Sequence, residues 1–316
     1  SSKKKKYHLQ KKRPLKIDPP KKRRALFAPI FIMEKDKEEE KKTLKTGVVP
    51  PVLKCVCFHG FSQNADAFRR RTGSIRTTKL KRKYEFVFLD APHAVDGVFG
   101  EEDGLREEEE RNANANAKAK NETVVDAKTT TNCSGHRSWW LAGENVESGA
   151  TKATDAAWVR PAKSRKIVGL EDSVELVRET FVKTEGEVRA LVGFSQGATF
   201  IALLRRKLPE LFKNVRKVVS IAGFDPLDEE AYAAAIDDDD DDGKGVKVKV
   251  ESKSLHVHGA NDALVTRDRC DRLRDLFYDA ENASTFEHEG GHGVPTSKQF
   301  REAFETFLLQ DDGAET

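Results

Sequence analysis

From about residue 52 onward, short apolar runs alternate with stretches whose apolar residues recur every three or four positions. Six runs predict strands: residues 52–58, 84–89, 188–194, 215–222, 254–258 and 284–288. Two sets of apolar residues have helical spacing, namely Leu170, Val174, Val177 and Phe181, and Phe300, Phe304, Phe307 and Leu308. Strands that are apolar throughout and alternate with helices predict an α/β fold with a mostly parallel central sheet and helices on both faces.

Two polar, low-complexity segments interrupt this pattern, at about 101–137 and 237–245. The first holds four consecutive Glu residues and an Asn-Ala repeat, and the second begins with six consecutive Asp residues. The aspartates lack the ligand spacing and central Gly of a calcium-binding loop. Because long loops between core elements cost little entropy, we expect both insertions to be solvated surface loops.

Composition fits one domain with polar attachments. The 316 residues are 37% apolar and 34% charged, with a net charge of +3, whereas a globular domain is usually nearer to 45–50% apolar. Residues 1–46 hold 17 Lys or Arg and 6 Asp or Glu, and the tail 311–316 carries a net charge of −3. We therefore predict a disordered basic extension at 1–46, one domain at 47–310 and an acidic tail at 311–316.

The basic clusters before residue 25 leave three interpretations open: a solubilising extension, a nuclear-import or nucleic-acid-contacting arm, or a transit peptide. No apolar run approaches the ~18 residues of a membrane span. The four cysteines lack Cys-x-x-Cys spacing, which favours a reducing compartment, and Cys55 and Cys57 are expected to be small buried residues on one strand face. The expected location is the cytoplasm or the nucleus, with organelle import less well supported.

Gly193-Phe194-Ser195-Gln196-Gly197 carries the strongest chemical signal. A buried strand precedes it and a helical pattern follows it, which is the context of a nucleophile elbow. The turn leaves no room for side chains two residues before and after the serine, hence the two glycines. We predict that Ser195 is a nucleophile whose Oγ lies above the helix N-terminus, where developing negative charge is stabilised.

A serine hydroxyl needs a base and a residue that orients the base. In this architecture the acid and then the histidine follow the nucleophile along the chain. Asp262 lies just after one predicted strand, and His292 lies after the next one, flanked by glycines. Asp225 is the main rival acid and His288 the main rival base.

The oxyanion hole requires two backbone N–H groups. One is expected from Gln196, the residue after the nucleophile, and the other from the loop after the first strand. In that loop we assign the donor to Phe61, with Ser62 as the fallback.

A metal centre is the competing interpretation, because His256 and His258 share a strand face upstream of Asp262. No zinc-ligand spacing is present. Paired histidines on a strand are more often packed or hydrogen-bonded, so we expect no metal.

The residues named so far belong to a longer series of motifs, which lie in this order along the chain: 59–64, Phe68, 71–76, 90–93, 138–140, 169–173, 193–197, 222–224, Asp262 and 290–295. Together they resemble the FSH family of serine hydrolases, a branch of the α/β-hydrolase superfamily, from about residue 53 to about residue 307. The resemblance implies an α/β-hydrolase fold and a Ser195–Asp262–His292 triad that hydrolyses carboxylic ester or thioester bonds without metal or organic cofactor.

The resemblance leaves several alternatives open. The paired Trp139 and Trp140 could line the acyl side of the cleft or pack in the core. The insertion 101–137, which ends just before them, could be a lid or a plain loop. The expected partner is a small acyl ester or thioester, and an acyl-protein or acyl-carrier thioesterase is a close alternative. A non-catalytic scaffold that binds nucleic acid through the arm is the alternative from another class. An intact triad argues against it, so nucleic acid is not an expected partner.

Overall fold

We describe a computed structural model of the chain, in which residues 53–95, 123–125, 135–184, 186–228 and 252–310 are described. The chain divides into two units, Ser1–Pro50 and Pro51–Thr316, and the first lies wholly outside the described residues. The predicted extension 1–46, the insertion 237–245 and the tail 311–316 also lie outside them and stay predictions.

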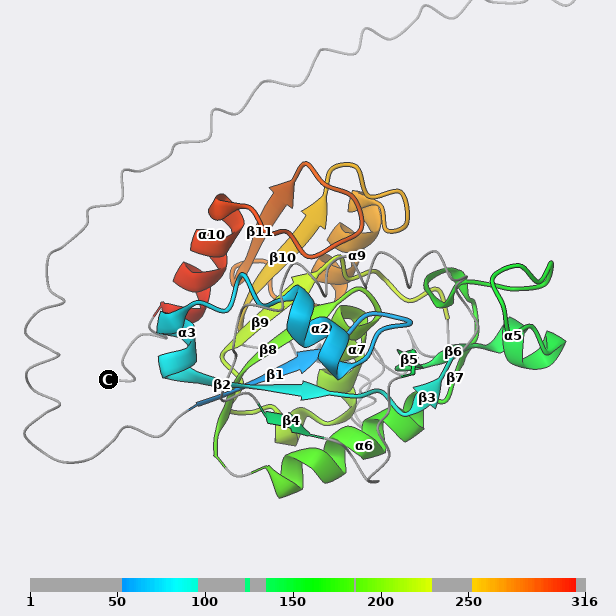
Figure 1. Cartoon of the computed structure of the whole chain (residues 1–316), viewed down its shortest axis with the longest axis horizontal. Helices are drawn as coiled ribbons and strands as arrows, with labels where there is room; N and C mark the ends of the chain where they lie inside the picture. Colours follow the sequence, from blue (N-terminus) through cyan, green and yellow to red (C-terminus); the bar gives the residue numbers. More distant parts are fainter. Residues whose placement is uncertain (1–52, 96–122, 126–134, 185, 229–251, 311–316) are drawn as a thin grey trace, which may run out of the picture. The chain divides into compact units, whose positions relative to one another are not determined.

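Seven parallel strands form the central sheet of the second unit, in the order β11-β10-β9-β8-β1-β2-β4 (Figure 1). Their bounds are β1 Leu53–Phe58, β2 Tyr84–Leu89, β4 Thr123–Val125, β8 Val188–Phe194, β9 Lys217–Ile221, β10 Lys253–Gly259 and β11 Ala283–His288. All six predicted strands are present, and the parallel arrangement is confirmed. Four two-residue strands, β3 His93–Ala94, β5 Arg137–Ser138, β6 Leu141–Ala142 and β7 Ile167–Val168, form two small antiparallel pairs beside the sheet.

Helices cover both faces of the sheet (Figure 1). The helices are α2 Ala65–Arg71, α3 Thr78–Lys83, α5 Gly143–Ser148, α6 Leu170–Lys183, α7 Gln196–Lys207, α9 Arg267–Phe277 and α10 Lys298–Leu309, with short 3-10 turns at η1 Pro161–Lys163 and η2 Pro209–Leu211. Val56 and Phe58 of β1 pack in one apolar core with α6, α7 and α9. Cys55 and Cys57, which alternate with them, pack in a second core with α2, α3 and α10. Both cysteines are buried, as predicted, and the layered arrangement is that of the α/β-hydrolase fold.

The segment 101–137 is more than the plain loop that its charge predicted. Thr123–Val125 forms edge strand β4, in parallel register with Val87–Leu89 of β2. The backbone of Arg137 is hydrogen-bonded to that of Ser62 and Gln63 in the loop after β1. Thr and Val favour strands, but three such residues inside a charged, repetitive segment give too short a signal to recognise.

Among the helices of the described residues, none combines the length and apolar composition that a membrane crossing needs.

Candidate active site

Ser195 sits on a strained turn between β8 and α7. Its backbone has φ 52° and ψ −117°, a combination that residues other than glycine rarely adopt. A Cβ on Gly193 would lie 2.6 Å from the Cα of Ala198, and one on Gly197 would lie 2.4 Å from the carbonyl oxygens of Phe58 and His59. The predicted elbow geometry is therefore present, including the steric need for both glycines.

Two loops bring the predicted acid and base to this serine. The acid loop, residues 260–266, joins β10 to α9 and carries Asp262, and the base loop, residues 289–297, joins β11 to α10 and carries His292. Nδ1 of His292 lies 2.7 Å from Oδ2 of Asp262, and Nε2 lies 2.9 Å from Oγ of Ser195. The carboxylate can only accept, so Nδ1 carries the proton and Nε2 presents its lone pair to the serine hydroxyl.

Backbone contacts hold these two loops together. The N–H of Ala260 donates to the carbonyl of His288 at 2.7 Å, and the N–H of Asn261 donates to the carbonyl of Gly290 at 3.2 Å. Gly259 lies so close to the base loop that a Cβ there would stand 2.4 Å from the oxygen of Gly290. Sequence reasoning did not single out Gly259, although a glycine at the end of an apolar strand can mark such a close approach.

The surroundings of Asp262 favour its ionised form. Burial opposes ionisation, but the hydrogen bond from His292 and two backbone N–H bonds outweigh it, so the pKa of Asp262 lies below its usual value. The two N–H groups belong to Leu264 and Val265, and both lie 2.9 Å from Oδ1. The carboxylate is thus held on one oxygen by its own loop and presents the other oxygen to the imidazole.

The rival acid and base have different partners. Asp225 accepts hydrogen bonds from Nε of Arg269 and Nε of Arg272, both at 2.8 Å. His288 accepts through Nδ1 from the N–H of Gly290 at 3.1 Å. Neither rival contributes to the hydrogen-bonded chain that ends on Ser195.

The loop after β1 supports one of the two assignments for the second oxyanion donor. The N–H of Ser62 donates to the carbonyl of Arg137 at 2.8 Å, so it is not available to a substrate, which leaves Phe61 as the prediction. Among the described residues, no acceptor takes a hydrogen bond from the N–H of Gln196, which lies at the first position of α7. That position agrees with the role predicted for Gln196.

His59 begins the same loop, and two hydrogen bonds hold its ring in place. Its Nδ1 donates to the carbonyl of Gly60 at 2.8 Å, and its Nε2 accepts from the N–H of Ala91 at 3.1 Å. Burial is the main reason that the pKa of His59 falls to about 4. The ring is therefore neutral near pH 7, and its two hydrogen bonds fix one tautomer.

Trp139 and Trp140 do not line an open cleft. Both are 0% exposed and belong to the apolar core that contains α6 and α7. The indole N–H of Trp139 donates to the carbonyl of His59 at 2.8 Å, and its ring stacks on Phe200 with centroids 4.8 Å apart. This burial favours the core-packing alternative over the substrate-lining one, because large aromatic rings gain more from burial than from exposure.

The side chain of Gln196 was not anticipated in the site. Its Oε1 accepts from the N–H of Trp139 at 2.9 Å, and its Nε2 donates to the carbonyl of Trp140 at 2.9 Å. The residue that follows the nucleophile thus ties the start of α7 to the segment that contacts His59. A polar residue inside an otherwise apolar helix start is the only sequence signal for this contact.

A partly exposed aromatic pair lies next to the predicted oxyanion loop. The ring centroids of Phe61 and Trp158 are 6.5 Å apart, and the Arg160 guanidinium lies 5.5 Å from the centroid of Trp158. Trp158 belongs to the long connection between α5 and β7, whose relation to the site the sequence did not reveal.

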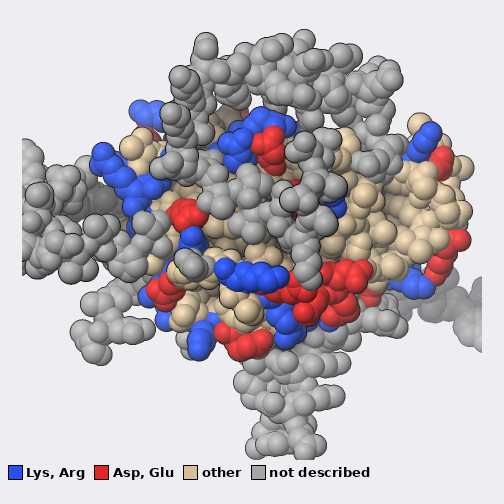
Figure 2. Space-filling model, turned by 60° about the horizontal axis from the view of Figure 1, so that its bottom comes forward, with Lys and Arg blue, Asp and Glu red and all other residues tan. Residues whose placement is uncertain are grey.

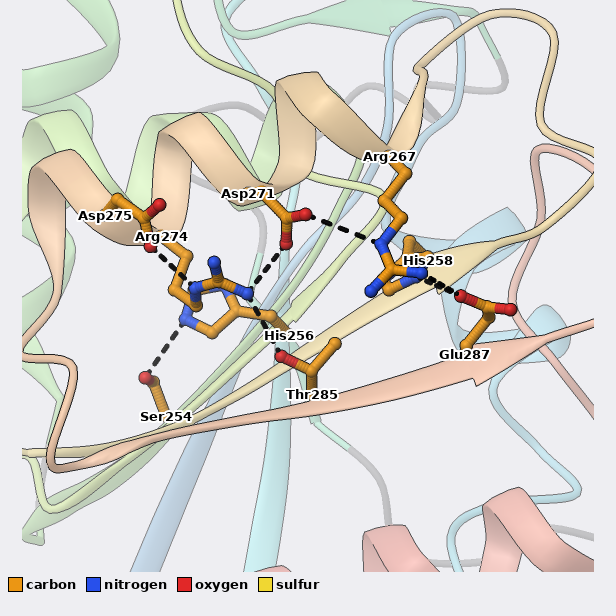
Figure 3. A network of polar contacts seen from close by, with 9 residues as sticks. All are labelled: Ser254, His256, His258, Arg267, Asp271, Arg274, Asp275, Thr285 and Glu287. Atoms are coloured by element: carbon orange, nitrogen blue, oxygen red, sulfur yellow. Dashed lines mark hydrogen bonds and ion pairs between the residues drawn. The ribbon is translucent and has the colours of Figure 1, made fainter. Parts of the chain in front are cut away.

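The histidines of the competing metal interpretation are engaged with neighbours, as Figure 3 shows. Nε2 of His256 lies 3.0 Å from Oγ of Ser254, and Nε2 of His258 lies 3.0 Å from Oε2 of Glu287. Across the described ranges, no group of three or more His, Cys, Asp or Glu side chains is arranged to hold a metal ion.

Comparison with known proteins gives this site a family. The model of the serine hydrolase family FSH1 matches residues 49–304, a span that includes Ser195, Asp262 and His292. Esterase OVCA2 of Danio rerio is 29% identical over 260 residues, covering 81% of this chain and 96% of the relative. Esterase CG5412 of Drosophila melanogaster is 27% identical over 274 residues, covering 85% of this chain and 77% of the relative.

Similar solved structures include Zea mays acyl-protein thioesterase 2, with a TM-score of 0.47, 13% identity, and coverage of 82% of this chain and 93% of that one. Arabidopsis thaliana SOBER1 matches with a TM-score of 0.42, 13% identity, and coverage of 81% and 99%. The sequence match decides the family, because one family model spans most of the chain. The chain belongs to the FSH1 serine hydrolase family and is a hydrolytic enzyme.

Proposed function

We propose that Ser195, His292 and Asp262 form a catalytic triad that hydrolyses carboxylic ester or thioester bonds through an acyl-enzyme. The observation that carries this proposal is the unbroken chain from Asp262 Oδ2 to His292 Nδ1 at 2.7 Å and from His292 Nε2 to Ser195 Oγ at 2.9 Å. These distances are those at which a base can take a hydroxyl proton.

In the acylation step, Ser195 Oγ attacks the substrate carbonyl carbon while His292 Nε2 takes the hydroxyl proton. Asp262 stabilises the imidazolium that forms and keeps the ring oriented, without taking the proton itself. The tetrahedral intermediate collapses as His292 returns the proton to the departing alcohol or thiol. The acyl group is then bound to Oγ as an ester.

In the deacylation step, water replaces the leaving group. His292 takes a proton from the water, whose oxygen attacks the acyl carbon, and Ser195 leaves with that proton. In both steps the carbonyl oxygen becomes negatively charged, and the N–H groups of Gln196 and Phe61 are the proposed donors to it.

Carboxylic esters are the substrate class that the family supports best. The relatives in Danio rerio and Drosophila melanogaster are named esterases, and a triad of this kind also cleaves thioesters. An acyl-protein or acyl-carrier thioesterase is the closest alternative, because it requires the same reacting groups and differs only in the leaving group.

The scaffold alternative gains no support from the described residues. It rests on the basic arm before residue 25, which lies outside them. The nuclear location rests on the same arm and the cytoplasmic one on the cysteine spacing, and both stay predictions. On the face seen in Figure 2, basic and acidic side chains are interspersed. A surface that binds nucleic-acid phosphates gathers Lys and Arg instead.

A series of substrates that differ in acyl chain length tests the proposal. Hydrolysis of p-nitrophenyl esters and of acyl thioesters is measured for the wild type, Ser195→Ala and the matched control Ser284→Ala, a hydroxyl removed from β11. We expect Ser195→Ala to lose at least about 1,000-fold in kcat while the control retains activity. Comparable turnover by Ser195→Ala would contradict the triad, and the ratio of ester to thioester rates distinguishes the two leaving groups.

A further inference from the structure

One carboxylate oxygen joins three elements beside the proposed triad. Oε2 of Glu287, on β11, lies 3.0 Å from Nε2 of His258 and 2.8 Å from Nη1 of Arg267. His258 is the next-to-last residue of β10, and Arg267 is the first residue of α9. Figure 3 shows both side chains converging on Glu287 across the two strands.

These positions frame the acid loop. His258 and Arg267 stand on either side of Gly259 and the acid loop, residues 260–266, which carries Asp262. Glu287 itself lies just before the base loop, in direct register with His258. A single side chain therefore joins the start of the acid loop, its end and the strand that leads to His292.

Arg267 occupies a position that a basic residue does not favour. The N-terminus of a helix carries partial positive charge, so an arginine at the first position of α9 is unfavourable unless an anion is nearby. The anions are supplied by Glu287 at 2.8 Å and by Asp271, one turn along α9, at 3.5 Å. The contact with Glu287 links the residue that follows the acid loop to strand β11.

The three side chains of this contact differ in burial. The side chain of His258 is 1% exposed, whereas those of Glu287 and Arg267 are 47% and 61% exposed. Because the carboxylate can only accept, Nε2 of His258 donates. An ion pair as exposed as Arg267–Glu287 contributes little to the free energy of unfolding. Its effect is therefore expected on the position of the acid loop.

We propose that Glu287 is a positioning residue for the Asp262–His292 pair, in which one carboxylate oxygen holds both ends of the acid loop against the strand that leads into the base loop. This inference rests on the proposed triad and adds a residue to it that does not touch substrate. Without Glu287, the backbone pairing of β10 with β11 still holds the start of the acid loop, but the His258 side chain loses its acceptor and the end of the loop, at Arg267, loses its contact with β11.

The test compares Glu287→Ala, Glu287→Gln and the control Glu281→Ala. The control removes an exposed carboxylate from the turn before β11, at the far end of the strand from the site. A misplacement of about 1 Å can cost roughly 100-fold in rate, so we expect Glu287→Ala to lower kcat by about tenfold with KM unchanged. Glu287→Gln keeps an oxygen acceptor for His258 and is expected to recover most of the rate.

A proton NMR measurement separates positioning from a general loss of structure. The low-field resonance of the His292 Nδ1 proton, identified by its loss in His292→Ala, reports the hydrogen bond to Asp262 in the free enzyme. We expect this resonance to shift or broaden in Glu287→Ala and to be retained in Glu281→Ala. Arg267→Ala is expected to lower kcat less, and combining it with Glu287→Ala should add no further loss, because both remove the same contact.

The outcomes distinguish the inference from the triad on which it rests. If Glu287→Ala keeps the wild-type kcat and an unchanged resonance, or if Glu281→Ala loses as much rate, the positioning role is wrong. If the wild type and Ser195→Ala turn over substrate equally, the triad itself is wrong, and the resonance alone then decides whether Glu287 orders the two loops.

Discussion

Gly259 lies directly against Gly290, so that a methyl group on Gly259 would stand 2.4 Å from the carbonyl oxygen of Gly290. This close approach brings the end of β10 against the base loop, where the N–H of Asn261 donates to the same oxygen at 3.2 Å. The distance between the proposed acid and base therefore depends on the absence of a side chain at residue 259.

Gly259→Ala is expected to separate the two loops. Overpacking of this kind costs about 1–3 kcal/mol in free energy of unfolding, and displacement of His292 should lower kcat as well. Urea unfolding and ester turnover measure both effects. Gly293→Ala is the matched control, because a Cβ there meets no atom within 4 Å. Equal effects of the two substitutions would show that the contact with Gly290 is unimportant.

The two candidate acids can be separated by amide substitutions. Asp262→Asn should lower kcat by about 10⁴-fold, because an amide no longer holds the imidazole in the required tautomer. Asp225→Asn should leave kcat within a small factor but lower the free energy of unfolding by about 2 kcal/mol, since Arg269 and Arg272 lose a charged partner. Steady-state kinetics and urea unfolding of both variants check this. The reverse pattern would make Asp225 the catalytic acid.

Buried histidines predict a loss of stability in mild acid. Burial lowers the pKa of His59 to about 4 and that of His256 to about 3, whereas an unfolded histidine titrates near 6.5. The unfolded chain therefore binds protons first, so stability is complete above about pH 6.5 and falls as the pH drops towards these values. For each ring the loss at pH 5 is roughly 2 kcal/mol.

His256→Gln isolates one of these contributions. Urea unfolding at pH 7 and pH 5 should show a smaller acid-induced loss in the variant than in the wild type, by roughly 2 kcal/mol. The comparison uses the difference between the two pH values, so any cost of the substitution at pH 7 cancels. An unchanged difference would mean that His256 is already accessible to protons in the folded state.

Trp139→Phe tests the core assignment of the tryptophans. The variant loses the hydrogen bond to the His59 carbonyl and part of the stacking on Phe200, which should cost about 2–4 kcal/mol in free energy of unfolding. The preference among acyl chain lengths should stay that of the wild type, because the indole is 0% exposed. A changed preference in the ester series would place Trp139 against the substrate after all.

Much of the central sheet was predictable because parallel strands buried on both faces are continuous apolar runs. The elbow was predictable for a similar reason, since Gly193 and Gly197 are required by backbone contacts made over a few residues. The order of Ser195, Asp262 and His292 along the chain then indicated which strand ends meet.

Other features depend on contacts between distant segments and leave little trace in the sequence. The N–H of Ser62 is taken by Arg137, 75 residues further along the chain, and edge strand β4 is recognisable only once Thr123–Val125 lies beside β2. The side chain of Gln196 is hydrogen-bonded to the backbone of Trp139 and Trp140, more than 50 residues earlier in the chain. Such partners follow from the fold and cannot be deduced from spacing.

The most direct test of the central claim is covalent labelling of the folded protein with a fluorophosphonate, followed by peptide mass spectrometry. The probe reacts with a serine only where a base activates it and an oxyanion site receives the phosphoryl oxygen. We predict one adduct per chain, on Ser195, with no adduct in Ser195→Ala and strongly slowed labelling in His292→Ala. No labelling of the folded wild type, or labelling of a different serine, would contradict the proposed triad.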